Sequence, residues 1–282
     1  RQAVPKMILQ VGGSISFSPK TADAKAKWLD YDTRHMLTEL DPKPDCVTVA
    51  TGTTQWDVMA WMTPEDIVGT HLENNPKVQE AWAGMWIDAG PRFYIEHLKR
   101  LRANRIHPYF VPAHVHQLEI IEGLIRAGVY MGPLNMAIAG YGGGTLGRNP
   151  YHWMDFLRQV PQGASTTFWS SMRGNIPIQT MALVLGQHIR VGNEDNLWGP
   201  DRKRRTTVQQ VEGAVRMCRE LGRKVATAEE ARAQMKLGIW YDSVEETLMQ
   251  LGLPPSRRDG QKGFLVMETD GKKGMGKTGG DS

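Results

Sequence analysis

The chain reads Gly-Gln-His-Ile-Arg-Val-Gly-Asn-Glu-Asp-Asn from Gly186 to Asn196, and this stretch decides the fold. Its first half has the alternation of a β-strand, in which successive side chains point to opposite faces. His188 and Arg190 therefore share one face, and Ile189 and Val191 share the other. In a barrel of parallel strands, the apolar face packs against the surrounding helices. The pattern predicts a barrel strand whose histidine and arginine point into the lumen.

Two carboxylates follow this strand at its carboxyl end. Glu194 and Asp195 stand where the active sites of α/β barrels lie. A carboxylate at that place can ligate a metal, and its neighbour can accept a proton or orient Arg190. The same residue types are also typical of a salt-bridged loop around a structural arginine. The pattern by itself leaves a catalytic and a structural role open.

Five further short, apolar and β-branched runs precede this strand, and helical patterns lie between most of them. Such an alternation predicts parallel strands joined by helical crossovers. The expected strands are Met7–Val11, Cys46–Thr51, Tyr109–Val115, Leu134–Ala139, Thr166–Trp169 and His188–Gly192. The expected helices are Pro91–Arg105, Gln117–Ala127, Tyr151–Val160, Ile178–Leu185 and Val208–Leu221, and a capping box at Thr227 starts another. We therefore predict an α/β fold, a TIM-type (β/α)₈ barrel.

The predicted barrel is incomplete, because these six strand patterns are two fewer than the eight that a closed barrel needs. The chain begins with Arg1 and runs almost directly into the first strand pattern. We expect an N-terminally truncated barrel domain over residues 1–237. A helical extension is expected over 238–259, with its helix at Ser243–Leu251, and a flexible Gly- and Lys-rich tail over 260–282.

Composition and charge exclude several classes of protein. With 40% hydrophobic and 23% charged residues, the 282-residue chain is neither disordered nor fibrous. No apolar run approaches the roughly 18 to 20 residues of a membrane helix, so no membrane partner is expected. The two cysteines exclude a disulfide framework and fit a reducing cytoplasm. The net charge of +4 is dense only at Arg202–Arg205, which we interpret as a solvated loop. A phosphate contact for an anionic ligand, such as a nucleotide-bearing cofactor, is the alternative, and a nucleic-acid site is disfavoured.

A His-x-His motif, His114 and His116, ends the expected strand Tyr109–Val115. Alternation would put both imidazoles on one face of that strand, with a spacing that a metal can use. One of the two could instead cap a helix or sit hydrogen-bonded in a core. Metal ligation by this pair is therefore one reading among these.

Small residues end three of the predicted strands, at Gly12–Ser14, Thr48–Thr53 and Gly140–Gly147. Backbone N–H groups and hydroxyls in such loops can hold a carboxylate, a phosphate or an oxyanion. Tight turns would use the same residues. No Walker P-loop and no Gly-x-Gly-x-x-Gly fingerprint is present. Ser14 has no paired histidine, so a serine-hydrolase triad is unsupported.

Taken together, these segments resemble the β-keto acid cleavage enzyme family. The resemblance includes Gly186–Asn196, Val208–Leu221 and Gly222–Arg232, and it extends back through Thr48–Thr53 to Gly12. It covers roughly residues 5 to 237. The run Arg-Val-Gly-x-Glu-Asp-Asn is its most specific part.

The resemblance implies a zinc-dependent (β/α)₈ barrel with C-acyltransferase activity of the retro-Claisen type. Its reaction moves the acyl group of a β-keto acid to coenzyme A, with acetyl-CoA as co-substrate and acetoacetate as product. Zinc would polarise the ketone and stabilise the enolate. The implied partners are a small β-keto acid and an acyl-CoA, and a homo-oligomer is expected.

The resemblance also implies roles for individual residues. Glu194 would ligate zinc with two histidines of a His-x-His strand. Arg190 and Asp195 would act together, through a water, in removing a proton from the substrate. The expected substrate-binding residues are Gly13, Thr48 and Gln10, the last standing where the family often has serine or threonine.

This sequence departs from the family pattern in two places. The family's His-x-His lies on its second strand, which precedes Arg1. Either the chain is a fragment, which we favour, or His114 and His116 replace those ligands. The region Tyr109–His114 lacks the usual acidic residues, so we predict a neutral or anionic β-keto acid. The alternatives are a metal-dependent aldolase or lyase on the same fold, and an inactive fragment that only binds acyl-CoA.

Overall fold

The computed structural model describes residues 3–13, 15–16, 27–28, 31–140, 145–170 and 175–256. Six parallel strands form one sheet in the order β1-β4-β7-β8-β9-β10. They are β1 Gln10–Val11, β4 Cys46–Ala50, β7 His107–Val111, β8 Asn135–Gly140, β9 Ser165–Ser170 and β10 His188–Ile189. All six expected strands are present, although the first and last are shorter than predicted and the third, β7, begins earlier and ends at Val111 instead of Val115.

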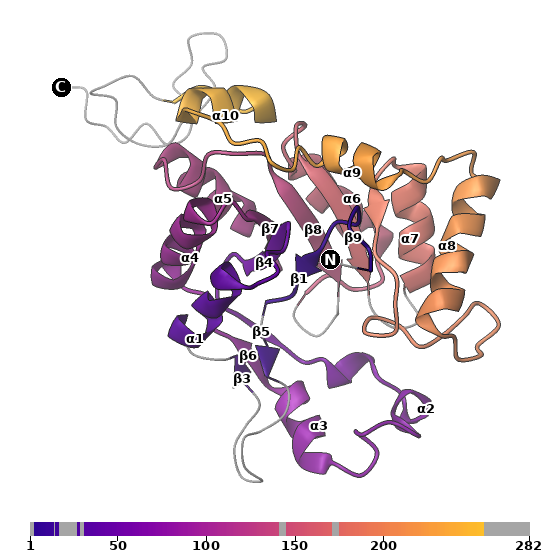
Figure 1. Ribbon diagram of the computed structural model, residues 1–282. Coiled ribbons are helices and arrows are strands. Elements are labelled where there is room, and N and C mark those ends of the chain that lie inside the picture. Colours follow the sequence, from indigo (N-terminus) through magenta and orange to yellow (C-terminus); the bar gives the residue numbers. More distant parts are fainter. Residues whose placement is uncertain are drawn as a thin grey trace, which may run out of the picture.

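The helices between and after the strands are also confirmed. They are α4 Pro91–Ala103, α5 Gln117–Arg126, α6 Pro150–Gln159, α7 Asn175–Val184, α8 Thr207–Glu220 and α9 Ala228–Gln234. Figure 1 shows α4 and α5 on one flank of the sheet and α7 and α8 on the other. Helices α8 and α9 both begin with a capping box, at Thr206 and Thr227. These caps fix the residue at which each helix begins.

The sheet has two unlike faces, because side chains alternate along each strand. The outer face packs against the helices in the main core, which includes Val47, Val49, Phe110, Met136, Ile138, Phe168, Leu98, Ile121 and Trp153. The inner face carries a second cluster, Cys46, Tyr109, Val111, Ala137, Ala139 and Trp169. The polar residues of the site stand on this inner side.

The sheet is curled, but it is open. Strands β1 and β10 lie at its two edges, and no other strand in the described part of the chain pairs with either edge. An eight-stranded barrel would have each edge hydrogen-bonded to a further strand. The α/β class with a curled parallel sheet is therefore confirmed. The complete eight-stranded barrel and its truncation stay predictions.

A segment between β4 and α4 was not predicted. It holds an antiparallel hairpin of β5 Thr54–Trp56 and β6 Met85–Ile87. Between these strands lie η2 Met59–Trp61, α2 Pro64–Ile67 and α3 Pro76–Ala83. Figure 1 shows these elements gathered at one end of the sheet. Pieces of three to eight residues show too few turns for a periodic pattern, which is why the sequence did not reveal them.

Short elements also precede β4. They are the antiparallel pair β2 Ile15–Ser16 and β3 Lys27–Trp28, then α1 Tyr31–His35 and η1 Met36–Glu39. After α9, the expected extension helix is present as α10 Val244–Leu251, capped by Ser243. Leu248 and Leu251 of α10 belong to the main core. The predicted tail 260–282 lies outside the described residues. Within those residues, no helix is both long and apolar enough to span a membrane.

Candidate active site

A cavity of about 670 Å³ opens at the carboxyl ends of the parallel strands. Its lining includes residues that end or follow five strands: Gly12, Gly13, Ala50, Gly52, Val111, Ala113, Trp169 and Arg190. Ligands of parallel α/β proteins bind at this end of the sheet. The predicted site residues Gln10, Gly13, Thr48, Arg190, Glu194 and Asp195 all line this cavity. The fold thus brings together residues from both ends of the chain, and their roles stay predictions.

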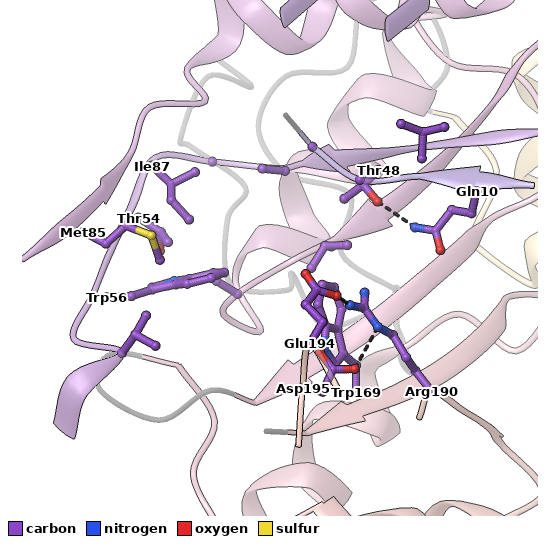
Figure 2. Close-up of a pocket in the computed structure, with 18 of the residues that line it drawn as sticks. Gln10, Thr48, Thr54, Trp56, Met85, Ile87, Trp169, Arg190, Glu194 and Asp195 are labelled. Carbon is purple, nitrogen blue, oxygen red and sulfur yellow. Dashed lines mark hydrogen bonds and ion pairs between the residues drawn. The ribbon is translucent and has the colours of Figure 1, made fainter. Parts of the chain in front are cut away.

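Arg190 stands at the centre of the polar side of the cavity (Figure 2). Its guanidinium carbon lies 3.6 Å from the centre of the Trp169 ring, a cation–π contact. Its Nε lies 2.8 Å from Oδ2 of Asp195, and its Nη2 forms an ion pair with Glu194. Gln179 of α7 donates a hydrogen bond to the carbonyl of Arg190, at 2.8 Å, which fixes the backbone there. The arginine is therefore held in place on several sides.

Asp195 is a buried carboxylate, with 1% of its surface exposed. The indole N–H of Trp169 donates to its Oδ1, and Arg190 pairs with its Oδ2. Burial raises the pKa of Asp195 above its ordinary value, and this effect outweighs the opposing attraction of Arg190 and the hydrogen bonds. A carboxylate with a raised pKa is a better proton acceptor. Asp195 thus has the property that a general base requires.

Glu194 differs from its neighbour in being 75% exposed at the side chain. An ion pair to so exposed a carboxylate is worth only about 0 to 1 kcal/mol. The pair with Arg190 can therefore be broken at little cost when another cation takes the carboxylate. Of the predicted metal ligands, Glu194 is therefore the one whose carboxylate can bind a cation beside Arg190 and Asp195.

Gln10 and Thr48 form the opposite polar edge of the cavity (Figure 2). The Gln10 side-chain amide donates to the Thr48 hydroxyl at 2.6 Å, across the β1–β4 pairing. The backbone of Gly12 and Gly13 follows immediately. A hydroxyl, an amide and glycine backbone at one strand end suit an anionic oxygen of a ligand.

Trp169 is a cavity residue that the sequence reading missed, and Tyr109 packs in the same inner cluster of the sheet. Trp169 touches both Arg190 and Asp195. Tyr109 is fully buried and hydrogen-bonds Thr167, and burial raises its pKa to about 12, so it stays protonated. The available signal was strand alternation, which puts Trp169 on the same face as Thr167 and thus toward the interior.

The prediction that the strand Tyr109–Val115 ends at the His-x-His motif, His114 and His116, is wrong. Strand β7 ends at Val111, because Pro112 has no N–H to continue the ladder. The chain then turns into α5, where Gln117 N–H bonds the carbonyl of His114 at 3.0 Å. The two imidazoles stack at 5.4 Å, and Nε2 of His114 contacts the Thr54 hydroxyl at 3.3 Å. Burial and the adjacent His116 lower the pKa of His114.

No metal cluster forms among the residues that the structure describes: no group of three or more His, Cys, Asp or Glu side chains is placed to hold an ion. His114 and His116 therefore do not join Glu194 in a ligand set. A catalytic zinc requires about three protein ligands. The described residues supply one of these, so they do not by themselves fit a zinc ion.

Three hydrogen bonds, from Trp198 and Arg204, join the β5–β6 segment to the loop after β10. The indole N–H of Trp198 donates to Asp66 of α2, and Arg204 donates to the carbonyls of Glu65, at 3.0 Å, and Val68. The run Arg202–Arg205 is solvated as predicted, since Arg202, Lys203 and Arg204 are exposed, although Arg204 also donates hydrogen bonds within the protein.

Replacing Asp66 by alanine is expected to destabilise the protein by about 1–3 kcal/mol. The change removes the capping box of α2 and leaves the Trp198 N–H without its acceptor. Urea denaturation measures the effect, with Asp155→Ala at an exposed carboxylate as the control. Equal urea midpoints for the two variants would show that the contact between Asp66 and Trp198 contributes nothing to stability.

A parallel α/β sheet with a charged cluster in a cavity at its carboxyl ends defines an enzyme-like class of protein. The family model described as beta-keto acid cleavage enzyme matches residues 1–237. The chain therefore belongs to the β-keto acid cleavage enzyme family. The predicted resemblance is confirmed.

Similar curated proteins have related names. A 3-keto-5-aminohexanoate cleavage enzyme from Acetoanaerobium sticklandii is 35% identical over 92 residues, which is 32% of this chain and 33% of that protein. An enzyme of the same name from Fusobacterium nucleatum is 35% identical over 79 residues, 28% of this chain and 29% of that protein. A 3-dehydrocarnitine:acetyl-CoA trimethylamine transferase from Rhizobium meliloti is 32% identical over 85 residues, 30% of this chain and 28% of that protein. The matched part spans about a third of each relative.

Solved structures of ObcA share the fold. The apo form has a TM-score of 0.61 at 14% identity, covering 84% of this chain and 52% of that chain. The binary complex with oxaloacetate has a TM-score of 0.58 at 15% identity, covering 84% and 54%. This chain therefore corresponds to about half of the ObcA chain.

Proposed function

We propose that this chain serves the cleavage of a β-keto acid by acyl transfer to coenzyme A. In the reaction, a 3-oxo acid and acetyl-CoA give an acyl-CoA and acetoacetate. The bond between C2 and C3 of the keto acid breaks, and C2 with its carboxylate forms a new bond to the acetyl carbonyl carbon, whose bond to the CoA sulfur breaks. The acyl group left behind takes the CoA sulfur. No oxidant or reductant is consumed.

The buried pair of Arg190 and Asp195 over Trp169 carries this proposal. A cleavage of this kind starts with loss of a proton from C2 of the keto acid. Asp195 would accept that proton through a water, and its raised pKa suits it to do so. Arg190 would hold the carboxylate of the substrate, beside the negative charge that develops on the substrate. Gln10, Thr48 and the backbone at Gly13 would hold the substrate's other polar groups.

The names of the similar proteins support the same chemistry. Two relatives are named as cleavage enzymes of a keto acid, and the third is named for acetyl-CoA as a reactant. One ObcA structure holds oxaloacetate, a small keto acid, and another is a ternary complex with a C4-CoA adduct and oxalate. These small acids and CoA adducts belong to the class of partners that we propose here. A homo-oligomer in a reducing cytoplasm also stays part of the proposal.

Acetyl-CoA dependence tests the proposed reaction against its alternatives. The chain would be incubated with a β-keto acid and acetyl-CoA carrying ¹³C in the acetyl group. We expect labelled acetoacetate and an unlabelled new acyl-CoA in equal amounts. Keto acid loss without acetyl-CoA would indicate a lyase or aldolase instead. Binding of acyl-CoA without any turnover would leave only the non-enzymatic reading.

Zinc stays part of the proposal, with Glu194 as the one ligand among the described residues, so the remaining ligands would have to come from outside them. We expect Glu194→Ala to weaken zinc binding at least about tenfold, since even indirect partners of a metal contribute that much. Titration against a fluorescent zinc chelator measures the affinity, and Glu119→Ala, a change in helix α5, serves as the control. If both variants bound zinc as the unaltered protein does, Glu194 would not be a ligand.

A further inference from the structure

The cavity has two chemically different halves. On one side stand the polar groups around Arg190 and Thr48, and on the other stands an apolar wall (Figure 2). The wall consists of Trp56, Val58, Met62, Trp82, Met85 and Ile87. Thr54, paired with Ile87 in the same hairpin, also lines the cavity, and its hydroxyl contacts Nε2 of His114. The wall is built by the β5–β6 hairpin, α3 and the segment around η2, none of which belongs to the parallel sheet.

All charge in the described lining lies on the polar half. Arg190, Glu194 and Asp195 are the only charged side chains among the described residues that line the cavity, and all three come from the end of β10. Met85 and Ile87 are almost fully buried, at 2% and 1% exposure. A charged group placed against this wall would lose its water and gain no opposite charge.

The wall is held in place before any ligand binds. The hairpin is closed at its base, where the Thr53 hydroxyl accepts from Ala89 N–H at 3.1 Å and donates to Asp88 at 3.3 Å. The contact of Asp66 with Trp198 ties the same segment to the loop that carries Asp195. The apolar and polar halves therefore keep a fixed relation, as selective binding requires.

We propose that the side chain of the β-keto acid is uncharged and apolar, and that it lies against this wall. The proposal rests on the proposed function and narrows it: the carboxylate and ketone take the polar half, and the carbon chain takes the wall. Aromatic rings such as Trp56 and Trp82 can also attract a cation. However, the other four wall residues are aliphatic or thioether side chains. They make no interaction with a cation that would compensate for the loss of its hydration.

A matched pair of substrates tests the inference. In 3-dehydrocarnitine a trimethylammonium group ends the chain, and in 5,5-dimethyl-3-oxohexanoate a tert-butyl group of the same shape replaces it. The two differ in charge and hardly in size. We expect the neutral acid to have a kcat/KM with acetyl-CoA at least tenfold higher, and a correspondingly lower Kd by calorimetry. A preference for the ammonium compound, or equal use of both, would overturn the inference and leave the proposed function standing.

Two variants of the hairpin locate the selectivity. Trp56→Glu puts a carboxylate on the wall, and we expect it to shift the ratio of the two kcat/KM values at least tenfold toward the ammonium compound. Trp86→Glu makes the same change on the outward side of the same hairpin, where the residue is 55% exposed, and should leave the ratio unchanged. If the two variants had the same ratio of kcat/KM values, the placement of the substrate side chain against the wall would be contradicted. If neither compound bound or reacted with the unaltered chain, the inference and the proposed function would both fail.

Discussion

Asp195→Asn is expected to lower the rate of CoA-dependent cleavage by about 100- to 10,000-fold, the usual contribution of a general base. Asparagine keeps the size of the side chain and its contact with Trp169, but it cannot accept a proton. The KM for the keto acid should change little, because Arg190 and the Gln10–Thr48 edge remain. Steady-state kinetics measure both values. A variant with more than a tenth of the original rate would rule out Asp195 as the base.

Asp155→Asn is the matched control, because Asp155 is an exposed carboxylate paired with Arg158 on α6. It should leave the rate unchanged. The pH profile supplies a second check. Because burial raises the pKa of Asp195, activity should fall as the pH drops through that raised value, and this limb should disappear in Asp195→Asn.

The same substitution should change how stability depends on pH. The folded protein holds the proton of Asp195 more tightly than the unfolded chain does, since the folded pKa is raised above 3.8. The group therefore favours folding below pH 3.8, and this contribution is lost as the pH rises through the folded pKa. Asparagine does not ionise, so the stability of Asp195→Asn relative to the original chain should increase across that window. Urea denaturation at several pH values measures it, and a constant difference would contradict the assignment.

Trp169→Ala is expected to have the largest effect on stability, a loss of about 3–5 kcal/mol. The side chain is 9% exposed and packs in the inner cluster of the sheet. Its loss removes the surface on which Arg190 lies and the N–H donor to Asp195. Denaturant unfolding gives the magnitude, and Trp86→Ala on the exposed hairpin face should cost less than about 1 kcal/mol.

Trp169→Phe separates packing from hydrogen bonding. Phenylalanine keeps an aromatic face under Arg190 but has no N–H for Asp195. We expect most of the stability to remain and the pKa of Asp195 to rise further, because a hydrogen bond that favours its charged form is gone. The acid limb of the pH–rate profile should move to higher pH. An unchanged limb would mean that Trp169 only packs.

Strand-level features could be predicted from the sequence with little error. The six parallel strands and the crossover helices follow from short apolar runs and helical periodicity, and both signals are local. The same local rule placed Arg190 in the cavity and Ile189 against the outer core. It failed at His114, because the proline at 112 ended the strand at Val111 and not at the predicted Val115.

The sequence by itself determined the alternation that turns Arg190 inward and the acidic pair that follows it, because neighbouring residues set the geometry of a strand. Only the tertiary structure decided what surrounds them. Trp169 meets Asp195 across 26 residues, and Asp66 meets Trp198 across 132. Such contacts, the burial that raises the pKa of Asp195 and the apolar wall at Trp56 depend on how distant segments pack together. A local sequence pattern does not reveal this packing, because the interaction energy arises only when the distant segments are in contact.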